Sequence, residues 1–357
     1  MDKKIIILGL IFLMFISGIY SEKIQTKIAT FSIIGYDEET QEIGIAVQSK
    51  FLAVGAVVPH ADADIGAVAT QAWAETSFAE KAFTLLEMGI NPEDIFSMTL
   101  KKDEGASSRQ FGIVAIDGSS AAWTGDECSP WAGHKYGKNY SVQGNILTNE
   151  KVIEDMEESF LNNKDLPLGE RLIKALQSGE KAGGDSRGRQ SAALYVVSKK
   201  GGYSGYSDKF IDIRVDDHKN PIEELYRIYQ LHEQTFQASS YIMRGVYYLK
   251  KNNETVAETM FNRAIEISDK YDKNAAILNS IAWEFAQNDY NLDYALLSAK
   301  KAYELEPDNP DIIDTLAVIY AKKGMYKQAI ELEKKAYKLS KNPSFKNNIE
   351  KWEKYLQ

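Results

Sequence analysis

The sequence predicts an α+β domain, in which antiparallel sheets are covered by helices, followed by an all-α domain built from repeats. Between residues 30 and 215, short apolar runs lie in pairs around turn sequences, and these pairs alternate with helical stretches. From about Gln237 the strand signals vanish, and a helical pattern recurs about every 35 residues. A chain of 357 residues is long enough for two such domains.

The first strands are expected to form a hairpin. Residues 30–36 and 42–48 are rich in β-branched and apolar side chains, and the turn sequence Asp37-Glu38-Glu39-Thr40 lies between them. Shorter apolar runs at 54–58 and 65–70 predict two further strands.

Two helices are expected to follow. The first covers residues 78–88 and ends at Gly89, a residue type that suits a helix terminus. The second begins after Pro92, where Glu93 and Asp94 suit the positive end of the helix dipole.

The rest of this domain continues the alternation of strands and helices. The remaining expected strands are 111–116, 121–123, 140–142, 145–147, 192–197 and 211–215, and the remaining expected helices are 150–161 and 168–177. Hairpins outnumber single crossovers in this pattern, which favours antiparallel sheets over a parallel wound sheet.

The carboxyl-terminal part contains three helical hairpins with the same marks. In each, a small residue is followed three positions later by an aromatic one, and the second helix carries two alanines: Gly245, Tyr248, Ala257, Ala264; Ala282, Phe285, Ala295, Ala302; Ala317, Tyr320, Ala329, Ala336. With Pro307 at the usual terminating place, the region 237–343 resembles a tetratricopeptide-repeat array, and 344–357 resembles its capping helix. Such arrays bind a protein or peptide partner in a concave groove. The alternative fold for this region is an irregular helical bundle.

The first residues are typical of a secretion signal. A charged start at Asp2-Lys3-Lys4 precedes an apolar stretch over 5–16, and Gly18 and Ser21 are small enough for signal cleavage. We expect a signal peptide at 1–21, a short propeptide-like segment at 22–29, and a periplasmic or secreted protein with no stable membrane insertion after cleavage. An uncleaved anchor is the alternative, but the apolar run is shorter than the ~20 residues that span a bilayer.

Charge and composition narrow the range of ligands. The chain carries 42 Lys+Arg against 51 Asp+Glu, so its net charge of -9 argues against nucleic acid as a partner. One cysteine cannot form an internal disulfide or a thiolate metal cluster. Asp216, Asp217 and His218 are adjacent, so their side chains alternate in direction and are expected to form a capping turn and not a metal site. No metal and no cofactor is predicted, and self-association into a homo-oligomer is left open.

The loop over residues 182–193 is the most unusual segment of the chain. It holds three glycines, Asp185, Arg187, Gln190 and Ser191, and leads directly into an apolar strand. Polar groups at the mouth of a buried strand are typical of a binding site, although a salt-bridged structural loop is an equal alternative.

Several motifs together resemble a known family. They are Thr30-Phe31-Ser32-Ile33, Gly44-Ile45-Ala46-Val47-Gln48-Ser49-Lys50, Ala69-Thr70-Gln71-Ala72-Trp73, Arg109-Gln110, Trp123-Thr124-Gly125, Gln143-Gly144-Asn145, the glycine-rich loop and Arg214-Val215-Asp216-Asp217-His218. Over about 30–231 the chain resembles the bacterial domain of unknown function ten twenty-eight, which is placed in the N-terminal-nucleophile (Ntn) hydrolase superfamily. The resemblance implies an αββα four-layer sandwich over 30–236 and a chain-terminal Thr, Ser or Cys as nucleophile.

The resemblance makes Thr30 the candidate nucleophile. A threonine hydroxyl is weak alone, but a free α-amine on the same residue, with a pKa near ~7.7–8.0, acts as its base. Thr30 is interior here, so a cut between Ala29 and Thr30 is required after signal cleavage. Without that cut, Thr30 is a β-branched residue that opens a strand.

The other expected site residues follow from the same resemblance. The candidate catalytic set is Thr30, Ser49, Lys50, Thr70, Gln71, Asn145, Asp185 and Arg187, and the candidate substrate-binding set is Gln190, Ser191 and Trp73. Each has a structural alternative, such as a solvated strand-end lysine for Lys50, a turn residue for Thr70 or Asn145, and an ion pair for Asp185 and Arg187. The expected function is hydrolysis of an amide or peptide-like bond in a small-molecule or peptide substrate. The alternative is a non-catalytic module that binds a small ligand and docks a protein.

Overall fold

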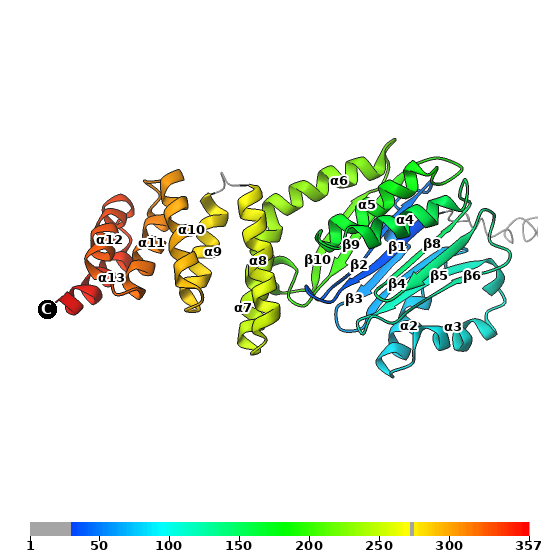
Figure 1. Cartoon of the computed structure of the whole chain (residues 1–357), viewed down its shortest axis with the longest axis horizontal. Helices are drawn as coiled ribbons and strands as arrows, with labels where there is room; N and C mark the ends of the chain where they lie inside the picture. The colour runs from blue at the N-terminus through cyan, green and yellow to red at the C-terminus, as the bar shows by residue number, and fades with distance from the viewer. Residues whose placement is uncertain (1–29, 272–274, 357) are drawn as a thin grey trace, which may run out of the picture.

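The computed structural model describes residues 30–271 and 275–356, so the expected signal peptide and propeptide-like segment lie outside the described residues. The strands gather in one half of the molecule, and a series of helical hairpins extends away from them as an arm (Figure 1). Within the described ranges, no helix combines the length and apolar character needed to cross a membrane.

A six-stranded antiparallel sheet holds both central strands of the first hairpin. In spatial order its strands are β10 (Lys209–Val215), β9 (Ser191–Val197), β2 (Glu42–Ser49), β1 (Thr30–Asp37), β8 (Tyr140–Asn145) and β7 (Gly133–Gly137). The register places Thr30 opposite Ser49 on one side and opposite Asn145 on the other. Three of the predicted site residues therefore meet at one end of three neighbouring interior strands.

A second, four-stranded sheet packs against the first. Its strands, in order, are β3 (Pro59–Asp62), β4 (Gly66–Ala72), β5 (Arg109–Ala115) and β6 (Ser120–Thr124). Because side chains alternate along a strand, Ile34 and Tyr36 of β1 face this sheet and bury an apolar cluster with Ala69 and Val114. Phe31 and Ile33 face the other way.

Helices cover the outer faces of both sheets. The α4 (Lys151–Asn162) and α5 (Leu168–Lys181) helices pack on the six-stranded sheet, around Phe31 and Ile33. The α2 (Phe78–Glu87) and α3 (Pro92–Thr99) helices cover the four-stranded sheet, where the Phe78 and Phe111 rings stack with centroids 3.9 Å apart. The sheet-rich half is thus a mixed α+β domain in four layers, as Figure 1 shows.

Two of the predicted strands are wrong. Residues Val54–Ala56 form a 3-10 helix, whose Val54 N–H donates to the Ser191 hydroxyl, while Gly55 lies so close to Ala193 that a Cβ there would be 2.6 Å away. A short apolar run does not distinguish a buried turn from a strand. The expected strand at 145–147 is also wrong, since β8 ends at Asn145 and Ile146 has a φ of 52°. The partner of β8 is instead β7, an edge strand with few apolar residues.

The carboxyl-terminal region is entirely helical in its described residues, as predicted. After α6 (Pro221–His232) and a π-helical turn (Glu233–Gln237), the hairpin helices are α7 (Ala238–Lys250), α8 (Glu254–Lys270), α9 (Ala275–Gln287), α10 (Leu292–Leu305), α11 (Pro310–Lys322) and α12 (Tyr326–Ser340), with α13 (Pro343–Glu353) last. Gly245 lets α7 approach the Phe261 ring of α8, since a Cβ at this position would lie 2.4 Å from it. Close helix contact therefore explains the small residues of the repeat pattern.

The helical arm is joined to the sheets by a buried ion pair. Arg244 of α7 is fully buried and donates to the Glu42 carboxylate at 2.8 Å and to the Thr40 carbonyl oxygen at 2.5 Å. The Ser240 hydroxyl adds a bond to the Gly201 carbonyl oxygen at 2.7 Å. The first hairpin of the arm is thereby fixed to the β1–β2 hairpin.

Candidate functional site

The candidate site lies where β1 begins, between the two sheets. Thr30 is fully buried, and strand alternation puts its side chain on the same face as Ser32, toward the four-stranded sheet. The Gln71 amide of β4 crosses the gap between the sheets and donates to the Thr30 carbonyl oxygen at 3.3 Å. Thr30 is therefore held by contacts from both sheets.

A buried polar network surrounds Thr30. The Ser32 hydroxyl donates to Oε1 of Gln71 at 2.7 Å and accepts from Nε2 of Gln143 at 2.6 Å. Gln71 in turn donates to Oε1 of Gln110 at 2.7 Å. Space for this network depends on Gly112, because a Cβ there would lie 2.3 Å from Oε1 of Gln143.

Gln110 is the centre of the network. Its Oε1 also accepts from the Asn145 amide at 3.0 Å, and its Nε2 donates to the Gly144 carbonyl oxygen at 2.8 Å and to the Thr124 hydroxyl at 2.9 Å. The Thr124 hydroxyl lies 2.8 Å from Nδ1 of His134, and burial lowers the pKa of this imidazole. Asn145, beside Thr30, uses one of its two amide N–H groups in the bond to Gln110 and keeps the other for a second acceptor.

The glycine-rich loop closes the edge of the site. The buried Asp185 carboxylate accepts the backbone N–H of Lys50 at 2.9 Å and pairs with the Arg187 guanidinium at 2.9 Å. A backbone bridge between Asp185 and Leu147 ties the loop to the end of β8. Asp185 thus fixes the ends of β2 and β8, the two strands on either side of Thr30.

Ser191 and Gln190 brace the same loop. The Ser191 hydroxyl donates to the Phe51 carbonyl oxygen and accepts from the Val54 N–H, and the Gln190 N–H donates to the Ser49 carbonyl oxygen at 3.1 Å. Gln190 also reaches Asp217 with its amide at 3.1 Å, while Nδ1 of His218 accepts the Asn220 N–H at the start of α6. These bonds make the 216–218 segment a capping turn.

The structure separates some of the other predicted site residues from Thr30. Thr70 points to the opposite face of β4, where its hydroxyl bonds the backbone of Glu75. Lys50 is exposed, and its ammonium donates to the Arg189 carbonyl oxygen at 3.2 Å. Trp73 follows β4, and its carbonyl oxygen accepts from Arg109 at 2.6 Å. By contrast, Ser49, Gln71 and Asn145 lie together around Thr30.

Sequence reasoning missed most of the network. Ser32, Gln110, Gln143, Thr124 and His134 were not among the predicted site residues. The available signal was the presence of amide side chains inside strands that are otherwise apolar, because buried polar groups are retained where partners satisfy them. Across the described ranges, no group of three or more His, Cys, Asp or Glu side chains is arranged to hold a metal ion.

Comparison with known proteins places the sheet-rich domain. The model of the family of unknown function DUF1028 matches residues 30–225. A crystal structure of protein SPO2555 from Silicibacter pomeroyi, a protein of the same family, is 32% identical, covers 57% of this chain and 89% of that chain, and superposes with a TM-score of 0.52. Among curated proteins, none matches the chain.

The helical region is similar to solved tetratricopeptide-repeat domains. The tetratricopeptide-repeat domain of the Arabidopsis protein OM64 is 18% identical, covers 33% of this chain and 94% of that domain, and gives a TM-score of 0.27.

The family model spans more than half of the chain, so the chain belongs to the DUF1028 family.

Proposed function

We propose that this member of the DUF1028 family is an exported hydrolase of the Ntn type, which cleaves an amide or peptide-like bond with Thr30. The observation that supports the proposal most strongly is the position of Thr30. It is the first residue of β1, its side chain faces the gap between two stacked sheets, and polar groups from three other strands surround it. Helices on both outer faces complete the four layers that this superfamily uses.

The proposed chemistry requires a cut between Ala29 and Thr30. The new α-amine then accepts the proton of the Thr30 hydroxyl as this oxygen attacks the carbonyl carbon of the substrate. The second N–H of the Asn145 amide, opposite Thr30 in the sheet, is the donor that we assign to the negative oxygen that develops. The amine returns its proton to the leaving nitrogen, and water then hydrolyses the ester formed on Thr30.

The surrounding residues position these groups in our proposal. Gln71 fixes the Thr30 carbonyl oxygen, and Asp185 fixes the backbone at Lys50, next to Ser49. Fixed donors are useful in such a site because they do not need to reorganise during the reaction. Gln190 and Ser191 support the loop at the edge of the site and are second-rank candidates for contact with substrate.

A non-catalytic module is the alternative, and one observation favours it. Thr30 is completely buried and hydrogen-bonded in the chain described here, as expected for a structural strand residue. Under this alternative, the sheet domain binds a small ligand and the helical arm docks a protein. We assign the arm to the tetratricopeptide type under both hypotheses, on the repeated small and aromatic residues and the hairpin arrangement of α7 to α12.

The two functions are distinguished by an acylation experiment on the exported protein. An electrophilic β-lactone should add covalently to Thr30, detected by peptide mass spectrometry, and T30A should take up none. T30S should retain labelling because it keeps both the hydroxyl and the amine. Equal labelling of T30A and wild type would exclude Thr30 as the nucleophile, and a protein that is never labelled supports the binding module.

A further inference from the structure

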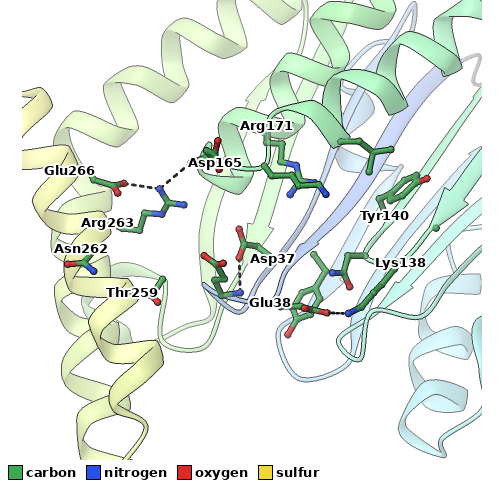
Figure 2. A pocket seen from close by; sticks show the side chains of 16 residues that line it. Asp37, Glu38, Lys138, Tyr140, Asp165, Arg171, Thr259, Asn262, Arg263 and Glu266 are labelled. Carbon is green, nitrogen blue, oxygen red and sulfur yellow. Dashed lines mark hydrogen bonds and ion pairs between the residues drawn. The ribbon is translucent and has the colours of Figure 1, made fainter.

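A second cavity, of about 850 Å³, lies between the sheet domain and the helical arm. Its walls come from the β1–β2 turn, the β7–β8 turn, the connection between α4 and α5, and the α8 helix (Figure 2). Asp37, at the end of β1, lines it, so the cavity lies roughly 23 Å along the strand from Thr30. It is therefore separate from the site proposed above.

Arg171 is the central feature of this cavity. Arg171 is only 9% exposed. Its Nε donates to the Phe160 carbonyl oxygen at 2.6 Å, and its guanidinium carbon lies 3.6 Å from the centre of the Phe160 ring. These contacts hold the group in one orientation. Among the described residues, Arg171 forms no ion pair within 4.0 Å, and its recorded hydrogen bond comes from Nε and not from either Nη atom. A buried cation with two free donor atoms is poised for a bidentate anion such as a carboxylate.

Two of the other long cations of the cavity are paired within the protein, and the third, Lys164, is exposed to solvent. Lys138 bonds Glu38 at 2.7 Å, and Arg263 of α8 bonds Glu266 at 2.8 Å (Figure 2). Their charges are compensated within the protein, so they do not create a general anion site. Arg171 is distinguished among these cations because it is buried, held in one orientation and has donor atoms available to a ligand.

Asp37 provides the opposite charge. Its Oδ1 accepts the N–H groups of Glu39 and Thr40 at 2.9 and 3.0 Å, which fixes the carboxylate at the turn. Asp37 acts on Arg171 through space, yet the two do not form an ion pair within 4.0 Å. The cavity thus holds a buried guanidinium and a carboxylate fixed at a turn, and the two are held apart. Its rim carries further charged residues, among them Glu39, Lys164 and Asp165. The α8 wall adds the uncharged polar side chains of Asn262 and Thr259, which suit backbone amides.

We propose that this cavity binds a short peptide with free termini, its carboxylate on the Arg171 fork and its ammonium beside Asp37. The volume suits a peptide of a few residues, because small-molecule sites span about 300–1,000 Å³. Since α8 supplies one wall, an occupied cavity bridges the sheet domain and the arm. The proposal does not depend on the reaction at Thr30.

The test is calorimetric titration of the full chain with trialanine, with its carboxyl-terminal amide and with its N-acetylated form. Trialanine should bind saturably, and the amide should bind at least about tenfold more weakly because it cannot accept both Arg171 donors. R171K should lower the affinity for trialanine to a similar extent. K151Q, a change in an exposed residue of α4 that does not line the cavity, should leave the affinity within about twofold.

A second variant keeps the test valid if R171K is poorly folded. D37N preserves an oxygen that caps the turn but removes the charge, so it should weaken trialanine while leaving N-acetyl-trialanine unchanged. T30A should bind trialanine as wild type does, which separates this proposal from the proposed function. Absence of saturable binding up to about 10 mM, or equal binding by wild type, R171K and D37N, would overturn the proposal.

Discussion

Buried amides are the feature that sets this chain apart at the scale of single residues. Gln71, Gln110, Gln143 and Asn145 lie inside strands that otherwise bury apolar side chains, and each has hydrogen-bond partners. Burial of such groups is costly unless they are paired, so the network acts as one unit. It also fixes the relative position of the two sheets, since Gln71 and Gln110 belong to one and Asn145 to the other.

Replacement of Gln110 should expose this dependence. In Q110L the Gln71 and Asn145 amides lose an acceptor, and the Gly144 carbonyl oxygen and Thr124 hydroxyl lose a donor. We expect the free energy of unfolding, measured by urea titration, to fall by about 3 kcal/mol. S97A on the exposed face of α3 should change it by less than about 0.5 kcal/mol. Equal stability of Q110L and wild type would show that the network contributes little.

At the scale of elements, hairpins and long amphipathic helices could be predicted from the sequence. The β1–β2 hairpin follows from two runs of apolar and β-branched residues on either side of the 37–40 turn, and α2, α4 and α5 follow from their helical patterns. The strand predicted at 54–58 was wrong because the backbone there is fixed by a distant part of the chain: the Val54 N–H donates to the Ser191 hydroxyl. The β7 strand was missed because an edge strand carries few apolar residues.

The site shows the same limit. The meeting of Thr30, Ser49 and Asn145 depends on the sheet register, which was not predicted, although the resemblance to a family had placed all three among the candidate site residues. Gln71 and Thr70 are adjacent in sequence, but strand alternation directs their side chains to opposite faces of β4, so only Gln71 faces Thr30. The Gln110 hub could not be found from spacing, because its partners come from four separate segments.

A buried carboxyl group beside the terminal helix α13 makes the stability of the folded arm depend on pH. Glu333 of α12 is fully buried beside Asp314 of α11, and the Asn348 amide of α13 bonds Glu333 at 2.7 Å. Burial, with the charge of Asp314 second, raises the pKa of Glu333 to about 9. The folded arm therefore binds more protons than the unfolded chain between about pH 4.5 and pH 9. Stability contributed by Glu333 is complete below this window and is lost as the pH rises through it.

The variant E333Q tests this dependence. It should be more stable than wild type at pH 8.5 by roughly 2 kcal/mol, and the two should converge toward pH 5. Urea unfolding at both pH values measures the difference, with the exposed E331Q on the same helix as the matched control. Two results together would contradict the raised pKa of Glu333: a wild type that is more stable at pH 8.5 than at pH 5, and an E333Q variant with the same stability as wild type at both pH values.

At the scale of the whole molecule, the sheet domain and the arm are coupled through Arg244. The guanidinium is fully buried between the β1–β2 hairpin and α7, and its partner Glu42 is also buried. Removal of one member of a buried pair leaves an uncompensated charge. The joint is therefore expected to fail when either residue is changed alone.

The variant R244M should destabilise the protein by about 3–5 kcal/mol and make the segment around α6 and α7 sensitive to protease. The double variant R244M/E42Q should recover part of this loss because no buried charge remains. R227M, which removes an exposed arginine of α6, serves as the control. Additive effects of R244M and E42Q would show that the pair is not coupled.

The proposed hydrolase activity depends on the state of Thr30 in the mature protein, since its free α-amine is the proposed base. The most direct test is the intact mass of the protein recovered from the exported fraction, with sequencing of its first residues. We predict a chain that starts at Thr30. A mature chain that retains Ala29 or any residue before it would contradict the proposed hydrolase, because the threonine nitrogen would then be an amide without basicity.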